Sequence, residues 1–359
     1  MKILILNWRC IKNPSMGGSE IYFYELAKRW IKSGHEVTWF SPMFKNGLSE
    51  EKIDGIKFIR EGGKYTGYIY SVFNYLKGSR DFDAIIDVEN GIPFFSPLYI
   101  KNKKIFLHIH HIHKNVWFKQ MPLPMALLGY VLETKIMPLI YKNKQIITLS
   151  KSSYDEIIKE KISKIEPKIV NPGIEFYKYK KVAKSKNPVV LFLNRIKKYK
   201  GINTFLETAK ELKEKNIEFW VVGDGDYLEN VKKYAQQNEL KNLKFFGRVS
   251  EGEKIELMQK AWIFVNPSYK EGWGIVNIEA NYFGTPVIGS NVAGIKDSVI
   301  DGKTGLLFKY GDYKLLAEKI ELLINNKKKL KEISKEAKKW ADEFDWDKKA
   351  EEYLNIISN

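Results

Sequence analysis

The stretch NPSYKEGWGIVNIEA, residues 266–280, decides how this sequence is interpreted. The apolar run at residues 262–265 predicts a buried strand before it, and the spacing of Ile275, Ile278 and Tyr282 predicts a helix after its glycines. A glycine-rich turn between such elements lies at the carboxyl end of a parallel strand, where open α/β sheets bind ligands. The N–H groups that begin the helix favour an anion such as phosphate.

Two glutamates in this stretch, Glu271 and Glu279, cannot act together on one bond. On a single helix they would lie about 12 Å apart along the axis, whereas a retaining glycosidase pair needs roughly 5 Å between its carboxyls. We therefore expect Glu271 in the turn, facing a reacting sugar, and Glu279 about one turn into the helix, facing ribose hydroxyls. A ligand that meets both, with its phosphates at Gly274, Ile275 and Val276, would be a nucleotide sugar.

The spacing Glu271-x7-Glu279, with Gly272-Trp273-Gly274 inside it and Gly-Thr-Pro at residues 284–286, resembles the signature of family 4 glycosyltransferases. These are retaining two-domain enzymes that include mannosyl- and glucosyltransferases and sucrose synthase. The resemblance covers nearly the whole chain and implies an α/β GT-B fold, with two doubly wound Rossmann-like domains facing across a cleft. It also assigns Gly272, Trp273 and Gly274 to donor binding.

Length and composition are those of an ordinary two-domain protein. The chain has 359 residues, 44% of them hydrophobic and 29% charged, and Cys10, its single cysteine, excludes an intrachain disulfide. The net charge of +17 favours phosphate-bearing partners or an anionic membrane face, with a lysine-rich proteome as the alternative. Without a signal-like start or an uncharged apolar run of 18 residues, we expect a cytoplasmic protein, with peripheral membrane contact as an option and no nucleic-acid partner.

Three parts are expected along the chain. Residues 1–177 should form an N-terminal acceptor-binding domain, and residues 178–340 a C-terminal domain that binds the nucleotide sugar. The polar, lysine-rich segment 178–187 reads as the linker between them. By the resemblance, residues 341–359 form a C-terminal helix that crosses back to the first domain.

The first domain begins with a strand–loop–helix pattern whose loop contains Gly17 and Gly18. It lacks the G-x-G-x-x-G spacing of dinucleotide-binding proteins, so NAD is not expected. The resemblance makes the two glycines the place where backbone approaches the donor diphosphate or the acceptor. A plain tight turn is the alternative.

Residues 104–113, KIFLHIHHIH, contain four of the five histidines. Strand alternation places His108 and His110 on one face and His111 and His113 on the other. Because no cysteine or acidic ligand lies close by in the sequence, a zinc site is not favoured. The resemblance places a histidine at the end of this strand, near the donor sugar. It is His110, or His111 if the register slips by one residue.

Two cations follow the apolar strand predicted at residues 189–193 and precede a helix. Arg195 and Lys200 can hold a diphosphate there, and the resemblance gives them the neutralisation of the leaving diphosphate. Asn194 stands where the family has glycine, and asparagine tolerates unusual backbone angles.

The sequence Asp224-Gly225-Asp226 spells the D-x-D by which other glycosyltransferases hold Mg²⁺ or Mn²⁺. Here it matches the family's strand-end turn, which begins at Gly223 and contacts the donor. With two cations already available, we expect neither a metal nor another cofactor. Arg248, at the end of the next strand, is assigned to the nucleobase, with a surface arginine as an equal alternative.

Two apolar segments of the first domain have more than one interpretation. The aromatic residues at 65–75 are accompanied by the basic residues Lys64, Lys77 and Arg80, and residues 117–141 are apolar with several prolines. For both, helices packed on their own domain are favoured. The alternative is a surface that docks lipid headgroups, glycans or an acceptor.

Taken together, these features predict retaining, metal-independent transfer of a hexose from a UDP- or GDP-sugar. The acceptor is a glycan, a lipid-linked sugar or a small molecule. The catalytic residues are Glu271, His110, Arg195 and Lys200. The alternatives are a GT-B phosphorylase or epimerase, and a non-catalytic protein that binds glycans or polyanions.

Overall fold

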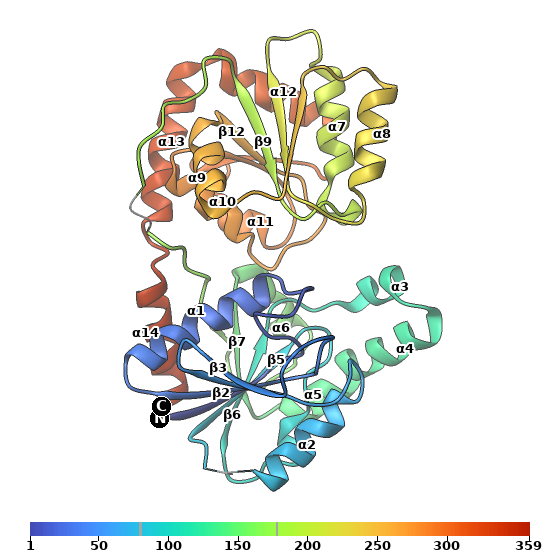
Figure 1. Cartoon of the computed structure of the whole chain (residues 1–359), viewed down its shortest axis with the longest axis vertical. Coiled ribbons are helices and arrows are strands. Elements are labelled where there is room, and N and C mark those ends of the chain that lie inside the picture. The colour runs from blue at the N-terminus through green and yellow to red at the C-terminus, as the bar shows by residue number, and fades with distance from the viewer. Residues whose placement is uncertain (79–80, 177–178) are drawn as a thin grey trace. The chain divides into compact units, whose positions relative to one another are not determined.

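The computed structural model describes residues 1–78, 81–176 and 179–359, without the side chains of residues 119 and 120 (Figure 1). It divides into two compact units. Unit 1 comprises Met1–Gly173 and Trp346–Asn359, and unit 2 comprises Ile174–Asp345. The domain boundary expected at residues 177 and 178 falls outside the described residues. The chain returns to unit 1 at Trp346 rather than at residue 341.

Unit 1 contains an eight-stranded sheet with the order β3-β4-β2-β1-β5-β6-β7-β8. All neighbours are parallel except β3 and β4. The chain moves outward from β1 in both directions, so the topological switch point lies between β1 and β5. The strands are β1 (Lys2–Leu6), β2 (Glu36–Ser41), β3 (Glu50–Ile53), β4 (Ile56–Arg60), β5 (Ala84–Glu89), β6 (Lys104–Ile109), β7 (Gln145–Thr148) and β8 (Lys168–Ile169).

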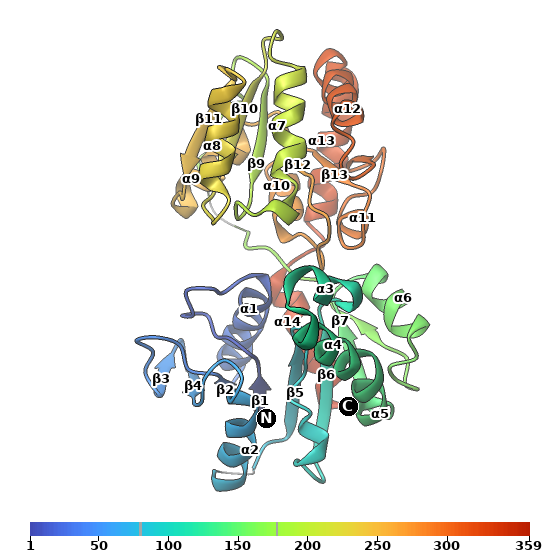
Figure 2. The same cartoon turned by 90° about the vertical axis from the view of Figure 1, so that its right-hand side faces the viewer.

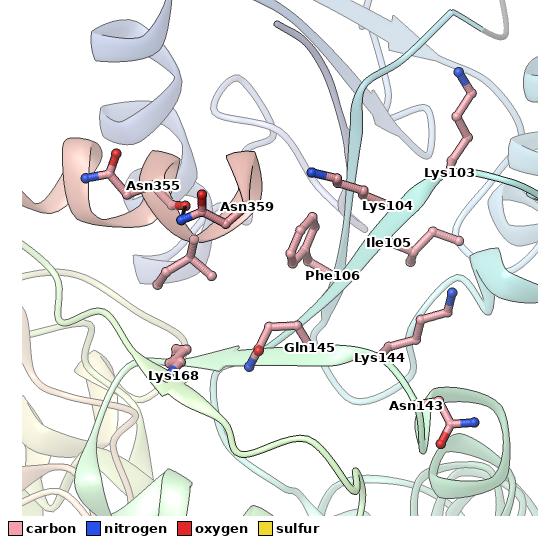
Figure 3. Close-up of a pocket in the computed structure, with 11 residues that line it drawn as sticks. Lys103, Lys104, Ile105, Phe106, Asn143, Lys144, Gln145, Lys168, Asn355 and Asn359 are labelled. Atoms are coloured by element: carbon pink, nitrogen blue, oxygen red, sulfur yellow. Dashed lines mark hydrogen bonds between the residues drawn. The ribbon is translucent and has the colours of Figure 1, made fainter.

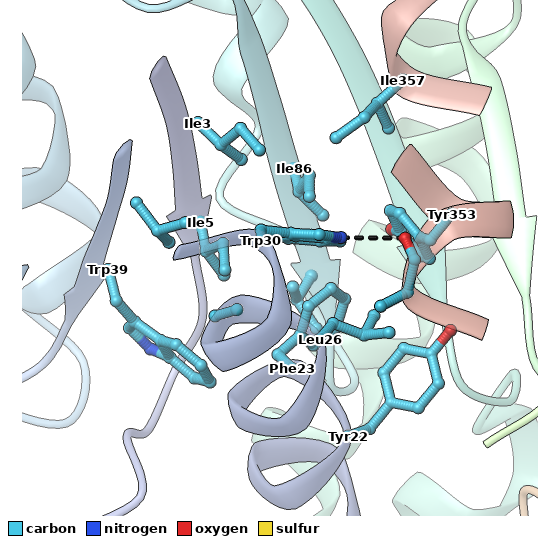
Figure 4. Packing of buried hydrophobic residues seen from close by; sticks show 14 of the residues in the cluster. Ile3, Ile5, Tyr22, Phe23, Leu26, Trp30, Trp39, Ile86, Tyr353 and Ile357 are labelled. Atoms are coloured by element: carbon cyan, nitrogen blue, oxygen red, sulfur yellow. Dashed lines mark hydrogen bonds between the residues drawn. The ribbon is translucent and has the colours of Figure 1, made fainter. Parts of the chain in front are cut away.

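Helices cover both faces of this sheet, because side chains of each buried strand alternate between two cores. Ile3 and Ile5 face the core that holds α1 (Gly18–Lys32) and α14 (Trp346–Ser358). There the indole of Trp30 donates to the carbonyl of Ala350 at 2.9 Å (Figure 4). Leu4 and Leu6 face the other core. Its helices and short turns are α2 (Gly67–Lys77), η1 (Ser96–Leu98), η2 (Lys114–Val116), α3 (Trp117–Gln120), α4 (Leu123–Val131), η3 (Leu132–Ile136, a π-helical turn), α5 (Met137–Tyr141) and α6 (Lys151–Lys159).

Unit 2 is built on a six-stranded, fully parallel sheet with the order β11-β10-β9-β12-β13-β14 (Figure 2). Its switch point lies between β9 and β12. The strands are β9 (Val189–Leu193), β10 (Glu218–Val222), β11 (Leu243–Gly247), β12 (Ile263–Asn266), β13 (Val287–Ser290) and β14 (Gly305–Phe308). The helices are η4 (Lys198–Lys200), α7 (Ile202–Glu211), α8 (Leu228–Gln237), α9 (Glu251–Lys260), α10 (Ile275–Tyr282), α11 (Ile295–Ser298), α12 (Tyr313–Asn325) and α13 (Lys327–Ala341).

The interpretation of residues 117–141 as core helices is wrong for most of their surface. Leu123 is 71% exposed, Leu128 60% and Leu139 70%, and only a narrow stripe of the helix is buried. Residues Leu123–Tyr141 form a 19-residue helix that is long and apolar enough, by length and composition alone, to cross a bilayer, and 22% of its 18-residue apolar window is buried. Core packing was expected because the segment is apolar throughout, but the side of the helix that faces away from unit 1 is as apolar as the side that faces it.

Helix α2 shows the same feature. Ser71 and Tyr75 are buried against unit 1, as expected of a helix packed on its own domain. Its outward side nevertheless carries Ile69, Tyr70 and Phe73, all of them exposed.

Candidate active site

Two loops meet at the switch point of unit 2, one after β9 and one after β12. Lys200 Nζ lies 2.5 Å from Glu271 Oε1, although the two residues are 71 positions apart in the sequence. Both side chains are largely shielded, at 12% and 14% exposure. The backbone N–H of Tyr269 donates to the carbonyl of Tyr199 at 2.9 Å, which fixes one loop to the other. The structure therefore brings together the cation and the carboxylate that the sequence singled out.

Gly201 makes this close approach of the two loops possible. It adopts a φ of +74°, and a Cβ atom at this position would lie 1.9 Å from the carbonyl oxygen of Pro267. Only glycine removes both the strain of a left-handed backbone and the clash. The position next to Lys200 is therefore fixed by packing within unit 2.

The ammonium group of Lys200 is held in its charged form. Burial opposes the charge, but Glu271 and Tyr199 outweigh burial, so the pKa of Lys200 is raised above its ordinary value. Arg195 acts in the opposite direction, which shows that its guanidinium lies close enough to be felt. The result is a permanent positive charge at the switch point.

A buried chain of polar side chains that was not predicted from the sequence holds Glu271 in place. Ser268 Oγ lies 2.9 Å from both Glu271 Oε1 and Asn266 Oδ1. Asn266 Nδ2 donates to Asn277 Oδ1 at 2.8 Å, and Asn277 Nδ2 donates to Ser298 Oγ at 2.9 Å. Asparagine at the end of an apolar strand and again inside an apolar helix face was the available signal, since buried amides require partners.

Helix α10 presents its amino terminus at the same edge of the sheet. Its N-cap is Gly274, with a φ of +85°, and among the described residues no side chain caps it. A helix leaves its first N–H groups without intrahelical partners, so the amides of Ile275 and Val276 are suited to an anion. A Cβ at Gly274 would lie 2.7 Å from Asn277 Nδ2, so glycine is required here by the chain itself.

Glu279 lies one turn into α10, and Glu271 lies in the preceding turn, as their spacing predicted. Glu279 Oε1 accepts from Lys254 Nζ at 3.0 Å, and Lys254 also contacts Glu251 at 2.7 Å. Burial opposes the charge on Lys254, but Glu279 and Glu251 outweigh it and raise its pKa. Lys254 could not be identified from the sequence, because it lies among other charged residues of α9 and resembles any solvated lysine.

The side chain of Trp273, a residue predicted to bind the donor, is buried in the hydrophobic interior of unit 2. Its side chain is 5% exposed, and its ring centroid lies 5.3 Å from that of Phe344 in a small hydrophobic cluster of unit 2. The indole therefore anchors the turn within unit 2. The neighbouring Gly272 is held by the loop before α11, where a Cβ at Gly294 would lie 2.2 Å from the carbonyl oxygen of Glu271.

The residues that directly follow β9 and β10, Asn194 and Gly223, lie so close together that position 223 requires glycine. Gly223 adopts a φ of +129°, and a Cβ there would lie 2.0 Å from the carbonyl oxygen of Asn194. Asn194 does not use the backbone freedom that asparagine allows, because it is not among the residues with positive φ. Its side chain instead accepts from the N–H of Arg195 at 2.9 Å.

The D-x-D residues and Arg248 lie at the neighbouring strand ends. Asp226 Oδ2 accepts from Lys197 Nζ at 2.9 Å, and that contact lowers the pKa of Asp226. Asp224 Oδ1 accepts from the N–H of Gly225 at 2.7 Å. Arg248 is exposed directly after β11.

In unit 1, Gly17 and Gly18 begin α1 at the carboxyl edge of the sheet. Neither adopts a positive φ, and a Cβ at Gly18 would meet no atom of the described chain within 4 Å. The buried carboxylate of Glu20 accepts from the N–H of Gly17 at 2.5 Å and from Arg9 Nε at 3.3 Å. Burial raises the pKa of Glu20. Nothing within the described chain explains why position 18 is glycine.

The histidines pair as their alternation predicted. The ring centroids of His108 and His110 lie 4.6 Å apart, and those of His111 and His113 lie 4.4 Å apart. His110 follows the last residue of β6 and is buried, and burial lowers its pKa to about 3. His111 is half-buried. His110 is therefore a neutral imidazole at physiological pH.

The expectation that no acidic group lies near these histidines is wrong. Glu89, from the end of β5, and Glu133, from η3, lie 3.6 Å and 3.5 Å from His113 Nδ1. The three residues offer ligand atoms within 4.8 Å of one another, a geometry that could hold a metal ion. Burial opposes protonation of His113, but Glu133 and Glu89 raise its pKa to about 9. The imidazolium has no free lone pair, so at neutral pH this cluster is an internal ion pair.

A hollow of about 520 Å³ lies elsewhere in unit 1 (Figure 3). It is lined by residues at the amino ends of β6, β7 and β8, among them Lys104, Gln145 and Lys168. Ligands of doubly wound sheets bind at the carboxyl ends of the strands. The hollow is therefore separate from the candidate site.

Unit 2 is a doubly wound unit with a shielded cation and a helix amino terminus at its switch point, an arrangement suited to a phosphorylated ligand. Two family models match the chain. The model described as "Glycosyl transferases group 1" matches residues 173–340, and the model described as "Glycosyltransferase Family 4" matches residues 16–176. The chain belongs to the group 1 glycosyltransferases, and it is a glycosyltransferase.

Sequence relatives agree with this assignment. An uncharacterized glycosyltransferase of Methanocaldococcus jannaschii is 30% identical over 279 residues, which cover 73% of this chain and 70% of the relative. A second one from that organism is 32% identical over 44% of each chain. The capsular polysaccharide biosynthesis glycosyltransferase CapM of Staphylococcus aureus is 34% identical over 50% of this chain and 52% of its own. The chain thus spans about half the length of two of these relatives.

Solved structures show the same fold. The sucrose-phosphate synthase of Thermosynechococcus elongatus superposes with a TM-score of 0.82 at 20% identity, covering 99% of this chain and 98% of that one. Anabaena HepE, in complex with UDP and glucose, superposes with a TM-score of 0.76 at 18% identity, covering 100% and 99%. The fold is GT-B, built of two Rossmann-like units.

Proposed function

We propose that this glycosyltransferase moves a hexose from a UDP- or GDP-sugar to a glycan, lipid-linked or small-molecule acceptor, with retention of anomeric configuration and without a metal ion. The observation that carries the proposal is the ion pair between Lys200 and Glu271 at the switch point of unit 2. It joins a fixed cation to a fixed carboxylate beside the uncapped amino terminus of α10.

The donor diphosphate is assigned to the positive side of this site. Lys200 Nζ and the guanidinium of Arg195 supply charge, and the amides of Ile275 and Val276 supply hydrogen-bond donors. Interactions that strengthen as charge develops on a leaving group lower the barrier rather than only the dissociation constant. Lys200 and Arg195 therefore act on the departing diphosphate.

The sugar and the ribose are assigned to the two glutamates. When the diphosphate arrives, Lys200 can contact both its oxygens and Glu271, which places the carboxylate beside the sugar attached to that diphosphate. Glu271 then orients the sugar hydroxyls or stabilises positive charge at C1. Glu279, held by Lys254, receives the ribose hydroxyls.

The transfer step balances without an additional reactant. The bond between C1 and the diphosphate oxygen breaks, and a bond from C1 to the acceptor oxygen forms. The acceptor proton passes to the departing diphosphate, which leaves as a nucleoside diphosphate. Retention follows if the acceptor attacks from the face that the leaving group vacates, and an enzyme-bound intermediate would give the same outcome.

The acceptor is assigned to unit 1. A relative of this chain is named for capsular polysaccharide biosynthesis, which supports a glycan acceptor. Gly18 leaves open space at the start of α1, and no contact within the described chain requires glycine there, which favours close approach of a ligand. His110 is proposed to contribute as a neutral hydrogen-bonding group.

The test is a thermal-shift screen of UDP-, GDP- and ADP-sugars, followed by mass analysis of products and NMR of their anomeric configuration. Lys200→Ala and Glu271→Ala should each lose most turnover while the protein stays folded. Lys197→Ala is the matched control, since it removes a lysine of the same loop that contacts Asp226 instead. Full activity in EDTA is expected.

The other candidate activities give different results in the same assays. A phosphorylase would require free phosphate, and an epimerase would form product without an acceptor. A non-catalytic glycan-binding protein would consume no nucleotide sugar. Any of these outcomes, or an inverted product, contradicts the proposal.

A further inference from the structure

The exposed hydrophobic side chains of this protein are concentrated in one part of unit 1. More than half of the exposed large hydrophobic residues in the described chain lie between residues 65 and 139. A monomeric soluble protein rarely exposes so many together without a binding role. They are Tyr65, Ile69, Tyr70, Phe73, Leu76, Leu98, Phe118, Leu123, Met125, Leu127, Leu128, Val131 and Leu139.

All of them except Tyr65, which precedes α2, belong to one layer of helices, here called the outer layer and formed by α2, η1 and α3–α5 (Figures 1 and 2). Tyr75 of α2 lies 6.2 Å from Tyr99, next to η1, and Phe95 lies 6.5 Å from Tyr141 of α5, measured between ring centroids. Tyr75, Tyr141 and Met137 also share one buried core on the same face of the sheet. Because the inner sides of α2 and α5 face that core, their outer sides point away from the sheet in the same general direction.

The exposed charged residues in the segments that form the outer layer are positive. Residues 62–78, 91–118 and 121–144 contain one acidic residue, Glu133, and it is buried. Exposed lysines flank the apolar residues, including Lys64, Lys77 and Lys135. A mixture of exposed leucines, aromatic rings and lysines without carboxylates is complementary to an anionic lipid surface.

We propose that the outer layer of unit 1 docks peripherally on an anionic lipid bilayer. The leucines of α4 and α5 enter the boundary between headgroups and acyl chains, and the lysines contact the phosphates. This inference concerns where the protein binds and is independent of the donor and acceptor proposed above.

The long helix at residues 123–141 lies on unit 1 rather than spanning the bilayer. Glu133, at its middle, accepts hydrogen bonds from the backbone N–H groups of His113 and Lys114 and from the indole of Trp117. Ala126, Gly129, Met137 and Tyr141 are fully or nearly fully buried in the unit. Crossing the hydrocarbon would strip this ionisable group and the buried stripe of their partners, which is costly.

The experiment is co-sedimentation of the full chain with vesicles of phosphatidylcholine, with and without phosphatidylglycerol. Binding is expected to require the anionic lipid and to weaken as salt rises. The double variant Leu127→Gln/Leu128→Gln removes two side chains that are 55% and 60% exposed, and it keeps good helix formers at both positions. We expect its partition coefficient to fall at least ~10-fold.

Leu322→Gln is the matched control, because Leu322 is 43% exposed on α12 of unit 2. It should bind vesicles like the wild type. Circular dichroism and thermal unfolding establish that both variants are folded, and Lys135→Glu tests the charge with an expected loss of roughly fivefold.

Absence of vesicle binding by the wild type would overturn the proposal, as would equal binding by the double variant and the control. Wild-type oligomers that the double variant abolishes, without vesicle binding, would identify a protein interface instead and equally overturn it. Donor turnover with a water-soluble acceptor should be unchanged in the double variant, so loss of docking is distinguishable from failure of the proposed chemistry.

Discussion

Replacing Lys200 by methionine removes one charge from the candidate site and leaves its volume almost unchanged. The partner carboxylate of Glu271 is 14% exposed, and the lost contact measures 2.5 Å. Leaving such a carboxylate without its cation should destabilise unit 2 by about 2–3 kcal/mol, somewhat less than for a fully buried pair. Removing one fixed charge donor from a leaving group costs about 3 kcal/mol of transition-state stabilisation, so turnover should fall roughly 100- to 1000-fold.

The double variant Lys200→Met/Glu271→Gln separates stability from catalysis. It leaves no unpaired charge, so thermal unfolding should recover most of the stability lost in the single variant. Release of nucleoside diphosphate should stay at least ~100-fold below the wild type, because the cation is still missing. Lys197→Ala, in the same loop, should change release less than about twofold, since Lys197 pairs with Asp226, which is 70% exposed, and not with Glu271.

Two results would refute this reasoning. One is turnover within fivefold of the wild type for Lys200→Met. The other is recovery of turnover together with stability in the double variant, which would mean that the pair only holds the fold.

Further predictions concern backbone, positioning and pH. Gly201→Ala should lower the free energy of unfolding, measured in urea, by more than about 3 kcal/mol. Gly284→Ala is the control, because Gly284 has a similar φ of +71° but a Cβ there would meet no atom within 4 Å, and it should lose about 1 kcal/mol. Equal losses in the two variants would contradict the clash at Gly201. Asn277→Ala should lower kcat about tenfold with little change in KM, and a change in KM alone would contradict a role in positioning. Lys254→Met should raise the donor KM more than it lowers kcat, and an unchanged KM would speak against ribose binding. The pKa of His113 rises from 6.5 to about 9 on folding, so its contribution to stability is full below pH 6.5 and is lost as pH rises through 9. His113→Gln should flatten that part of the melting profile, and an unaltered profile would exclude the ion pair.

The parts of the fold with regular patterns could be predicted from the sequence. The turn at Glu271 and the helix that carries Glu279 followed from the glycines and from the spacing of apolar residues, and both are confirmed. The distance between Lys200 and Glu271 could not be predicted, because it depends on which strands are neighbours. It becomes understandable once β9 and β12 are seen to flank the switch point.

Other features depend on contacts that local patterns do not encode. The partners of His113 come from two distant segments, Glu89 and Glu133, so the sequence around the histidine suggested that no acid was near. The buried position of Trp273 is set by Phe344 in the same way. The exposed surface of the outer layer was only the alternative at the sequence level, because an apolar residue such as Leu128 reads as core unless the surface that would cover it is known.

The most direct test of the central claim is a crystal structure of the protein soaked with UDP or GDP. We predict that the diphosphate binds in unit 2 within hydrogen-bond distance of Lys200 Nζ and of the amides of Ile275 and Val276, with the ribose at Glu279. A nucleotide bound at another edge of the sheet, or a diphosphate that does not contact Lys200, would contradict the account.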